Sequence, residues 1–150
     1  MSIDDLCYMS AHEALKRFRN LSLSPVELLE AIIEKADSIT DTVNPFADRY
    51  FEEALERAKK SEALYVQRTA DIGPIEGIPL AVKDLCEIAG KRTTAGSLIN
   101  AQNICEQTSP HVQRLMDAGA NVLHEQQPPN LRGCLPLSPK CGGSPIILGK

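Results

Sequence analysis

The residue of this sequence that could most readily do chemistry is Lys83, which follows the short apolar segment 78–82. A lysine acts as a base only when its amine is neutral. Burial against apolar side chains favours the neutral amine by lowering the pKa of the lysine. We expect Lys83 to be placed for such burial at the end of a strand. Taken without other information, a solvated lysine at a strand end is the simpler interpretation.

A second segment of interest is the small, polar stretch 93–97, Thr-Thr-Ala-Gly-Ser, whose composition is typical of a loop. A plain turn explains this segment nearly as well as a site does. The three histidines are scattered, and surface or capping roles are sufficient for them. The five cysteines include no C-x-x-C pair, so we expect reduced thiols and neither a metal site nor a disulfide framework.

A longer motif surrounds Lys83, since residues 73–84 read Gly-Pro-Ile-Glu-Gly-Ile-Pro-Leu-Ala-Val-Lys-Asp. This segment closely resembles the one that carries the catalytic lysine in amidase-signature enzymes. Residues 92–97 resemble the Arg-Thr-Thr-x-Gly-Ser that follows it in that family, and residues 24–28 and 118–120 are similar to further elements. The resemblance covers residues 5–124. Two motifs at this spacing are far more specific than a lone glycine-rich loop.

The resemblance implies an α/β fold in which helices flank a large mixed sheet, and this chain would hold an incomplete, N-terminal part of it. It implies hydrolysis of amide C–N bonds by a serine nucleophile, a second serine in a cis peptide bond, and Lys83 as the base acting through that second serine. Thr94, Gly96 and Ser97 would lie in loops near the site. The substrate would be a small-molecule amide, and serine–lysine chemistry requires no metal or cofactor.

Two functions remain open for a chain with this motif. In the amidase-signature enzymes that this chain resembles, both serines lie in a Gly/Ser-rich segment that would fall well beyond position 150. Residues 142–144 come too early to replace that segment. The first function is an amidase-family C–N hydrolase, inactive in this 150-residue form. The second is a catalytically inactive remnant or non-enzymatic binding fragment of a disrupted amidase gene. The absent nucleophile favours the second, whereas the motif around Lys83 favours the first for the ancestry of the chain.

The elements that would position Lys83 follow from apolar periodicity and capping signals. Ser10 with Glu13 and Ser24 with Glu27 form capping-box pairs before apolar helical stripes. The predicted elements are a helix opened by Ser10, a helix opened by Ser24, a helix over 47–65, a strand over 78–82, a helix from 109–110 to a stop at 119, and a strand beginning at 121–123.

Residues 125–150 differ in character, because they show neither helical nor strand periodicity and are rich in Pro, Gly and Cys. We therefore divide the chain into part of an amidase domain, 1–124, and an irregular tail, 125–150. If the codons of this tail are read one base out of frame, they can encode Ala-Arg-Thr-Thr-Thr-Pro-Glu-Phe and Trp-Gly-Val-Thr. These two segments resemble the continuation of the family's sequence. Our hypothesis is a frameshift from about Leu123 onward. A divergent tail and a splice variant are the alternatives.

Composition excludes several other classes. The net charge is -4 and no block of Lys and Arg is present, so binding to nucleic acid is unsupported. No apolar run approaches the ~20 residues of a membrane-spanning helix. The N-terminus lacks the basic-then-apolar order of a signal peptide. We therefore expect a cytoplasmic protein without a membrane partner.

Overall fold

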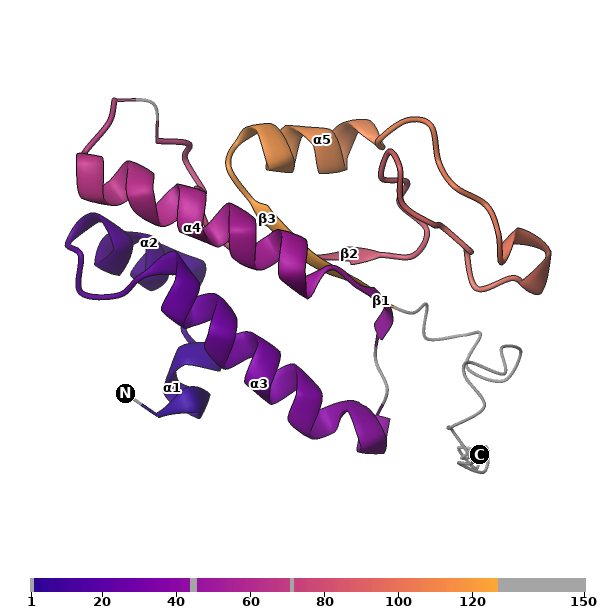
Figure 1. Cartoon of the computed structure of the whole chain (residues 1–150), viewed down its shortest axis with the longest axis horizontal. Coiled ribbons are helices and arrows are strands. Elements are labelled where there is room, and N and C mark those ends of the chain that lie inside the picture. Colours follow the sequence, from indigo (N-terminus) through magenta and orange to yellow (C-terminus); the bar gives the residue numbers. More distant parts are fainter. Residues whose placement is uncertain (1, 44–45, 71, 127–150) are drawn as a thin grey trace.

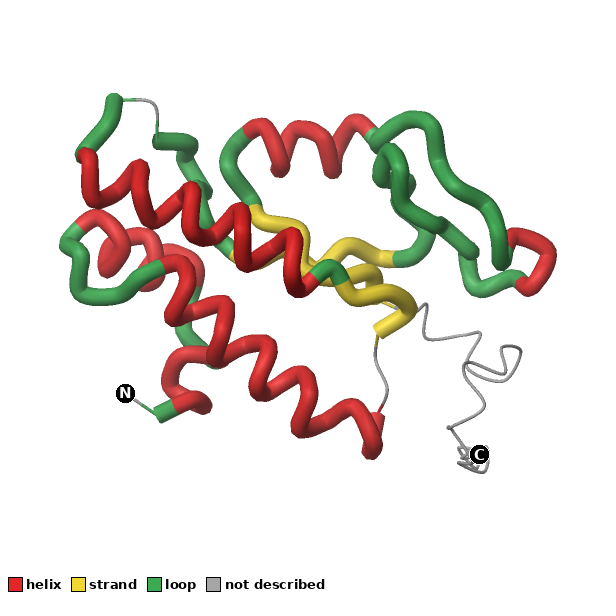
Figure 2. Tube along the Cα trace, viewed as in Figure 1, coloured by secondary structure: helices red, strands yellow, loops and turns green. Residues whose placement is uncertain are grey.

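The computed structural model describes residues 2–43, 46–70 and 72–126. Figures 1 and 2 show how the helices and strands of these ranges are arranged. The elements are α1 (Ile3–Cys7), α2 (Ala11–Arg19), α3 (Pro25–Val43), β1 (Phe46–Arg49), α4 (Phe51–Gln67), β2 (Pro79–Lys83), the 3-10 helix η1 (Leu98–Asn100), α5 (Pro110–Asp117) and β3 (Asn121–Gln126). Residues 127–150, on which most of the predicted tail and of the frameshift hypothesis falls, lie outside the described residues.

The strands form a mixed sheet in the order β1-β3-β2, so that β3 is central. β3 runs antiparallel to β1 and parallel to β2, with Pro79 opposite Asn121 and Lys83 opposite Gln126. A parallel pair needs a crossover connection, and the segment that contains α5 supplies it (Figure 1). A partial mixed sheet flanked by helices is the fold class that the sequence predicted.

Helices cover both faces of the sheet. Successive side chains of a strand point to opposite faces, so the contacts of the strand residues show which helices lie on each face. Leu123 of β3 is buried in a cluster with Leu29 of α3 and Ala54 of α4. On the other face, Val82 of β2 is buried against Val112 of α5. The long helices α3 and α4 therefore cover one face, and α5 covers the other.

The predicted start of the helix over residues 47–65 is wrong, because the helix begins later in the structure. Residues 46–49 form β1 instead, and the helix α4 runs from Phe51 to Gln67. Distant partners decide this boundary: the N–H of Tyr50 donates to the carbonyl of Leu123 at 3.0 Å, and Asp48 forms an ion pair with Arg92. Apolar periodicity could not reveal these contacts, since both partners lie far along the chain.

The two predicted capping pairs form to different extents. At α3 the Ser24 hydroxyl accepts the Val26 N–H at 2.9 Å, and Glu27 accepts the Ser24 N–H at 2.8 Å, which gives the expected reciprocal cap. At α2 the Ser10 hydroxyl accepts the Glu13 N–H at 3.2 Å. The Glu13 carboxylate, however, pairs at 2.7 Å with the arginine one turn later. An ion pair on the helix surface has therefore replaced half of that cap.

A buried carboxylate fixes the turn that leads into β2. Glu76 accepts a hydrogen bond from the Ser61 hydroxyl of α4 at 2.5 Å, and the Tyr65 hydroxyl donates to the Glu76 carbonyl at 2.9 Å. Gly119, which follows α5, has a φ of +101° and passes so close that an added Cβ would lie 2.3 Å from Glu76 Oε2. The turn before β2 and the end of α5 therefore pack against each other at Gly119, where there is no room for a side chain.

Replacing Gly119 by alanine should destabilise the chain in two ways. A left-handed backbone alone costs a non-glycine residue about 1–3 kcal/mol, and the contact with Glu76 should add to that loss. Gly90 is a matched control, because its φ is +76° but nothing lies within 4 Å of an added Cβ. Chemical denaturation should show a larger loss for Gly119→Ala than for Gly90→Ala. Equal losses would contradict the close packing.

Candidate functional site

Lys83 is the last residue of β2, where the chain leaves the sheet in a tight turn. Its carbonyl accepts hydrogen bonds from the N–H groups of Leu85 at 2.7 Å and Cys86 at 2.9 Å. Val82 is buried, whereas Ala81 and Lys83, which alternate with it, are exposed. The expected burial of Lys83 is therefore wrong for the described residues. The apolar residues precede the lysine in the sequence but do not cover its side chain.

Asp84 joins the end of β2 to the loop 92–97. Its side chain is 1% exposed, and its Oδ1 accepts the N–H of Thr94 at 2.6 Å. The Thr94 hydroxyl donates to Oδ2, and Thr94 is itself 3% exposed. A buried carboxylate is costly unless it is hydrogen-bonded, and both of its oxygens have a donor here. This pair holds the turn that carries Lys83 against the loop.

Asp84 is not among the candidate residues that the sequence indicated, since there it only marks the end of a strand. Two signals could have identified it. An acidic residue two positions after the buried Val82 lies on the buried side of the chain and needs a partner, and the Thr-Thr pair nine and ten residues later offers a hydroxyl and backbone N–H groups. The pairing itself could not be deduced from spacing, because the loop between the two has no regular period.

The structure brings Thr94, Gly96 and Ser97 together in one turn that contacts Asp84 through Thr94. The N–H of Gly96 donates to the Thr94 hydroxyl at 3.0 Å, and the N–H of Ser97 donates to the Thr94 carbonyl at 2.9 Å. Gly96 has a φ of +69°, a conformation that glycine adopts freely. The Ser97 hydroxyl accepts the N–H of Ile99 and so caps η1. Thr94 is thus the centre of the turn, whereas Ser97 has a capping role.

Arg92 ties the same loop to β1. Its guanidinium makes two hydrogen bonds to the Asp48 carboxylate, from Nε at 3.0 Å and from Nη2 at 2.9 Å. These bonds raise the pKa of Arg92 above its ordinary value. A bidentate pair of this kind restricts direction as well as distance. The loop 92–97 is therefore fastened at two points, to β1 through Arg92 and to the end of β2 through Thr94.

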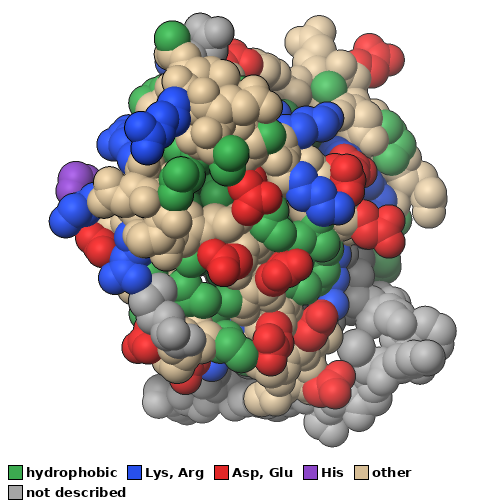
Figure 3. Space-filling model, turned by 60° about the vertical axis from the view of Figure 1, so that its left-hand side comes forward, with side chains coloured by type: hydrophobic (Ala, Val, Ile, Leu, Met, Phe, Trp, Pro, Cys, Tyr) green, Lys and Arg blue, Asp and Glu red, His purple; other side chains and the backbone are tan. Residues whose placement is uncertain are grey.

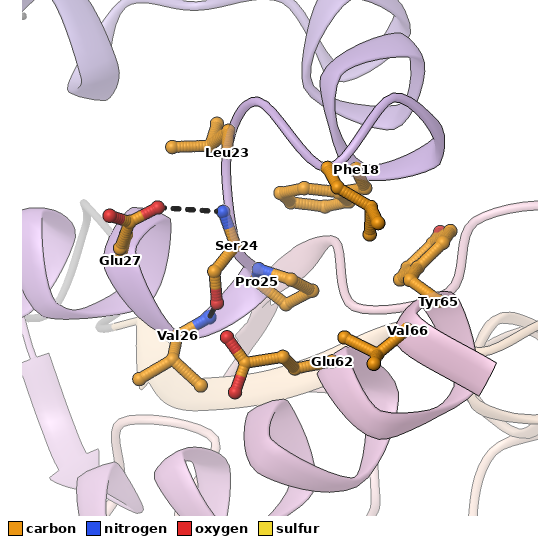
Figure 4. Close-up of a pocket in the computed structure, with 10 residues that line it drawn as sticks. Phe18, Leu23, Ser24, Pro25, Val26, Glu27, Glu62, Tyr65 and Val66 are labelled. Atoms are coloured by element: carbon orange, nitrogen blue, oxygen red, sulfur yellow. Dashed lines mark hydrogen bonds between the residues drawn. The ribbon is translucent and has the colours of Figure 1, made fainter.

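A pocket of about 380 Å³ lies away from this site (Figure 4). Residues of α2, α3, α4 and the loop between α2 and α3 line it, among them Phe18, Pro25, Glu62 and Tyr65. Its lining includes no residue of the Lys83 turn or of the loop 92–97, so it is not the candidate active site. On the molecular face in Figure 3, basic side chains are interspersed with acidic and apolar ones.

Two further features of the described residues bear on function. Among the residues that the structure describes, no three His, Cys, Asp or Glu side chains are grouped so as to hold a metal ion. In the same ranges, no helix has both the length and the apolar character that a membrane crossing requires. The expected independence from cofactors and the cytoplasmic location stay predictions.

The comparison with protein families assigns the chain to a family. The profile of the Amidase family matches residues 27–127, so the chain belongs to this family. Over 119 residues the chain is 33% identical to a glutamyl-tRNA(Gln) amidotransferase subunit of Moorella thermoacetica, and the match covers 79% of this chain and 24% of that protein. It is 29% identical to the acylamidase of Rhodococcus erythropolis over 133 residues, with 86% and 27% coverage.

A solved structure of fatty acid amide hydrolase shows the same fold. It superposes with a TM-score of 0.78 at 23% identity, over 85% of this chain and 22% of that chain. This chain spans about a quarter of the length of the curated relatives that it matches. The resemblance of residues 73–84 and 92–97 to amidase-signature enzymes therefore agrees with both sequence and fold.

Thr94→Val should destabilise the chain, because it removes the donor to Asp84 and the acceptor of the Gly96 N–H. An unsatisfied buried polar group costs about 1–3 kcal/mol. Thr93 is a matched control, since it is 6% exposed and its hydroxyl has no partner among the described residues. Thr93→Val should be neutral or stabilising in chemical denaturation. A loss at Thr93 as large as that at Thr94 would contradict the assignment.

Proposed function

We propose that this chain contributes the lysine base and the loop 92–97 to an amide-hydrolysing active site. Its membership of the Amidase family supports cleavage of a C–N bond. The observation that carries the role of Lys83 is the anchoring of the next residue, Asp84, to Thr94 by two hydrogen bonds. This anchor fixes the turn from which the lysine extends. A base that must meet a reacting hydroxyl needs such a fixed origin.

The proposed chemistry begins with a serine whose hydroxyl proton passes to the neutral amine of Lys83. By resemblance, a second serine in a cis peptide bond relays this proton. The serine oxygen then attacks the amide carbonyl, the C–N bond breaks, and the proton is returned to the leaving amine. Water then hydrolyses the acyl-serine ester, which releases the carboxylic acid and restores the serine. No cofactor takes part, and the substrate is a small-molecule amide rather than a nucleic acid.

The exposure of Lys83 adds a requirement to this mechanism. A lysine in water is charged at neutral pH, and removal of water from the amine is what makes it a base. We therefore propose that the part of the enzyme that carries the two serines also covers the exposed side of β2 at Ala81 and Lys83. The same contact would then bring the nucleophile and dehydrate the base.

The exposed lysine also favours a second candidate function. A chain that is never completed by a serine-bearing part would leave Lys83 exposed to water and without a hydroxyl to deprotonate. It would then be a catalytically silent remnant of an amidase gene, with at most a binding role. The two candidates differ in whether the reading frame of the locus continues as an amidase.

The nucleotide sequence of the locus, from the codon of Gly119 to well past that of Lys150, distinguishes these candidates. We expect a one-base shift to restore the two family-like strings and a later Gly/Ser-rich segment with its serines. Confirmation of the present frame, with no such continuation and no hydrolysis of simple amides by the 150-residue protein, would favour the silent remnant.

In the longer protein from the restored frame, Lys83→Met should lower kcat for a small amide by about 10²–10⁴-fold, the usual contribution of a general base. Lys59→Met is the control, since Lys59 is an exposed lysine on α4 that pairs with Glu56 on its own helix. Its steady-state kinetics should match those of the unchanged enzyme. Hydrolysis at the normal rate by Lys83→Met would exclude the proposed role.

A further inference from the structure

A thiol and an imidazole lie side by side next to the Lys83 turn. The Cys86 Sγ is 3.3 Å from the Nε2 of His111, which is in the first turn of α5. Cys86 is half-buried and His111 is exposed, so the pair is accessible from solvent. The N–H of Cys86 donates to the Lys83 carbonyl at 2.9 Å, which holds the cysteine within the tight turn after β2.

The N-terminus of α5 adds to the environment of this thiol. Ser109 occupies the N-cap position, yet its side chain makes no capping hydrogen bond to the helix. Its hydroxyl accepts the N–H of Glu87 at 2.9 Å instead, and its own N–H donates to the Glu87 carbonyl at 2.9 Å. The first turn of α5 is thereby fixed beside Cys86 without a side-chain cap, and the positive end of a helix favours a nearby anion.

The other cysteines with described side chains have different surroundings. The Cys7 thiol donates to the carbonyl of Ala31 at 3.5 Å, and burial raises the pKa of Cys7. Cys105 is buried, at 6% exposure. Reactivity of a thiol depends on access and on a neighbouring group that favours the thiolate. Among these three, Cys86 alone combines partial exposure with an adjacent imidazole.

We propose that Cys86 and His111 form a nucleophilic thiol site that is oxidised by hydrogen peroxide. His111 Nε2 takes the proton of the thiol, and the thiolate sulfur attacks one peroxide oxygen. An S–O bond forms, the O–O bond breaks, and the departing hydroxide takes the proton from His111 to leave as water. The sulfur is oxidised by two electrons to a sulfenic acid, and the peroxide is reduced. This site is separate from the amide chemistry proposed for Lys83.

Other charged groups around the pair must be considered for its pH dependence. Lys83, Asp84 and Glu87 belong to the same turn, and Arg114 lies one helical turn beyond His111 on α5. Asp84 is turned inward to Thr94. The His111 ring is the group among these whose Nε2 lies 3.3 Å from the sulfur. It is therefore the residue whose replacement should alter reactivity at about pH 7.

The test uses the full chain and measures each cysteine by mass spectrometry after trypsin digestion. Cys7, Cys86 and Cys105 fall in separate tryptic peptides, since Lys83 and Lys91 bracket Cys86. Iodoacetamide at about pH 7 should label Cys86 roughly tenfold faster than Cys7. Hydrogen peroxide followed by a dimedone probe should mark Cys86 as the sulfenic acid. Labelling of Cys7 at the same rate would overturn the proposal.

His111→Gln is the decisive variant, because glutamine can still reach the sulfur but cannot take its proton. We expect labelling of Cys86 to slow about five- to tenfold at about pH 7 and to differ little at about pH 9.5, where a thiol ionises without help. His12→Gln, at an exposed histidine of α2, should change neither rate. Unchanged labelling in His111→Gln would overturn the proposal. Faster labelling at both pH values would also overturn it, since it would mean that His111 only shields the thiol.

Discussion

The hydrogen bonding of β3 on both of its edges is the constraint on which the rest of the structure depends. The N–H of Asn121 donates to the Ile78 carbonyl at 2.8 Å on one side, and the Leu123 carbonyl accepts the Tyr50 N–H at 3.0 Å on the other. The Asn121 side chain donates to the Ala54 carbonyl of α4 at 2.7 Å. Backbone groups inside a core must be paired, so this one strand sets the positions of β1, β2 and α4 together.

Placement of the candidate site follows from that strand. β2 can end at Lys83 beside β3 only because the parallel register aligns the two strands, and the turn that follows is held by a carboxylate with donors on both oxygens. Arg92 and Asp48 then fasten the loop 92–97 to the opposite edge of the sheet. The backbone of the site is therefore anchored to both edge strands of the sheet. Its lysine side chain, by contrast, extends into solvent.

This contrast accords with a protein that spans about a quarter of the length of its relatives. The face of the sheet beneath α3 and α4 has a well-buried core around Leu29 and Leu123. The exposed side chains at the end of β2 have no such cover among the described residues. A lysine base works only after dehydration, so the proposed amidase chemistry depends on a surface beyond the part of the chain that the structure describes. The Cys86–His111 pair has no such requirement, because both of its groups lie within the described chain.

The sequence by itself determined the family motif, the position of Lys83 at a strand end, and most helices. Caps, turns and apolar periods are local signals, and Ser24, Glu27 and Gly119 express them within a few residues. Only the tertiary structure decided that residues 46–49 form a strand, that Asp84 holds Thr94, and that Lys83 is exposed. Each of these depends on partners distant in the sequence or on the surfaces packed around a side chain. Spacing along the chain carries no information about either.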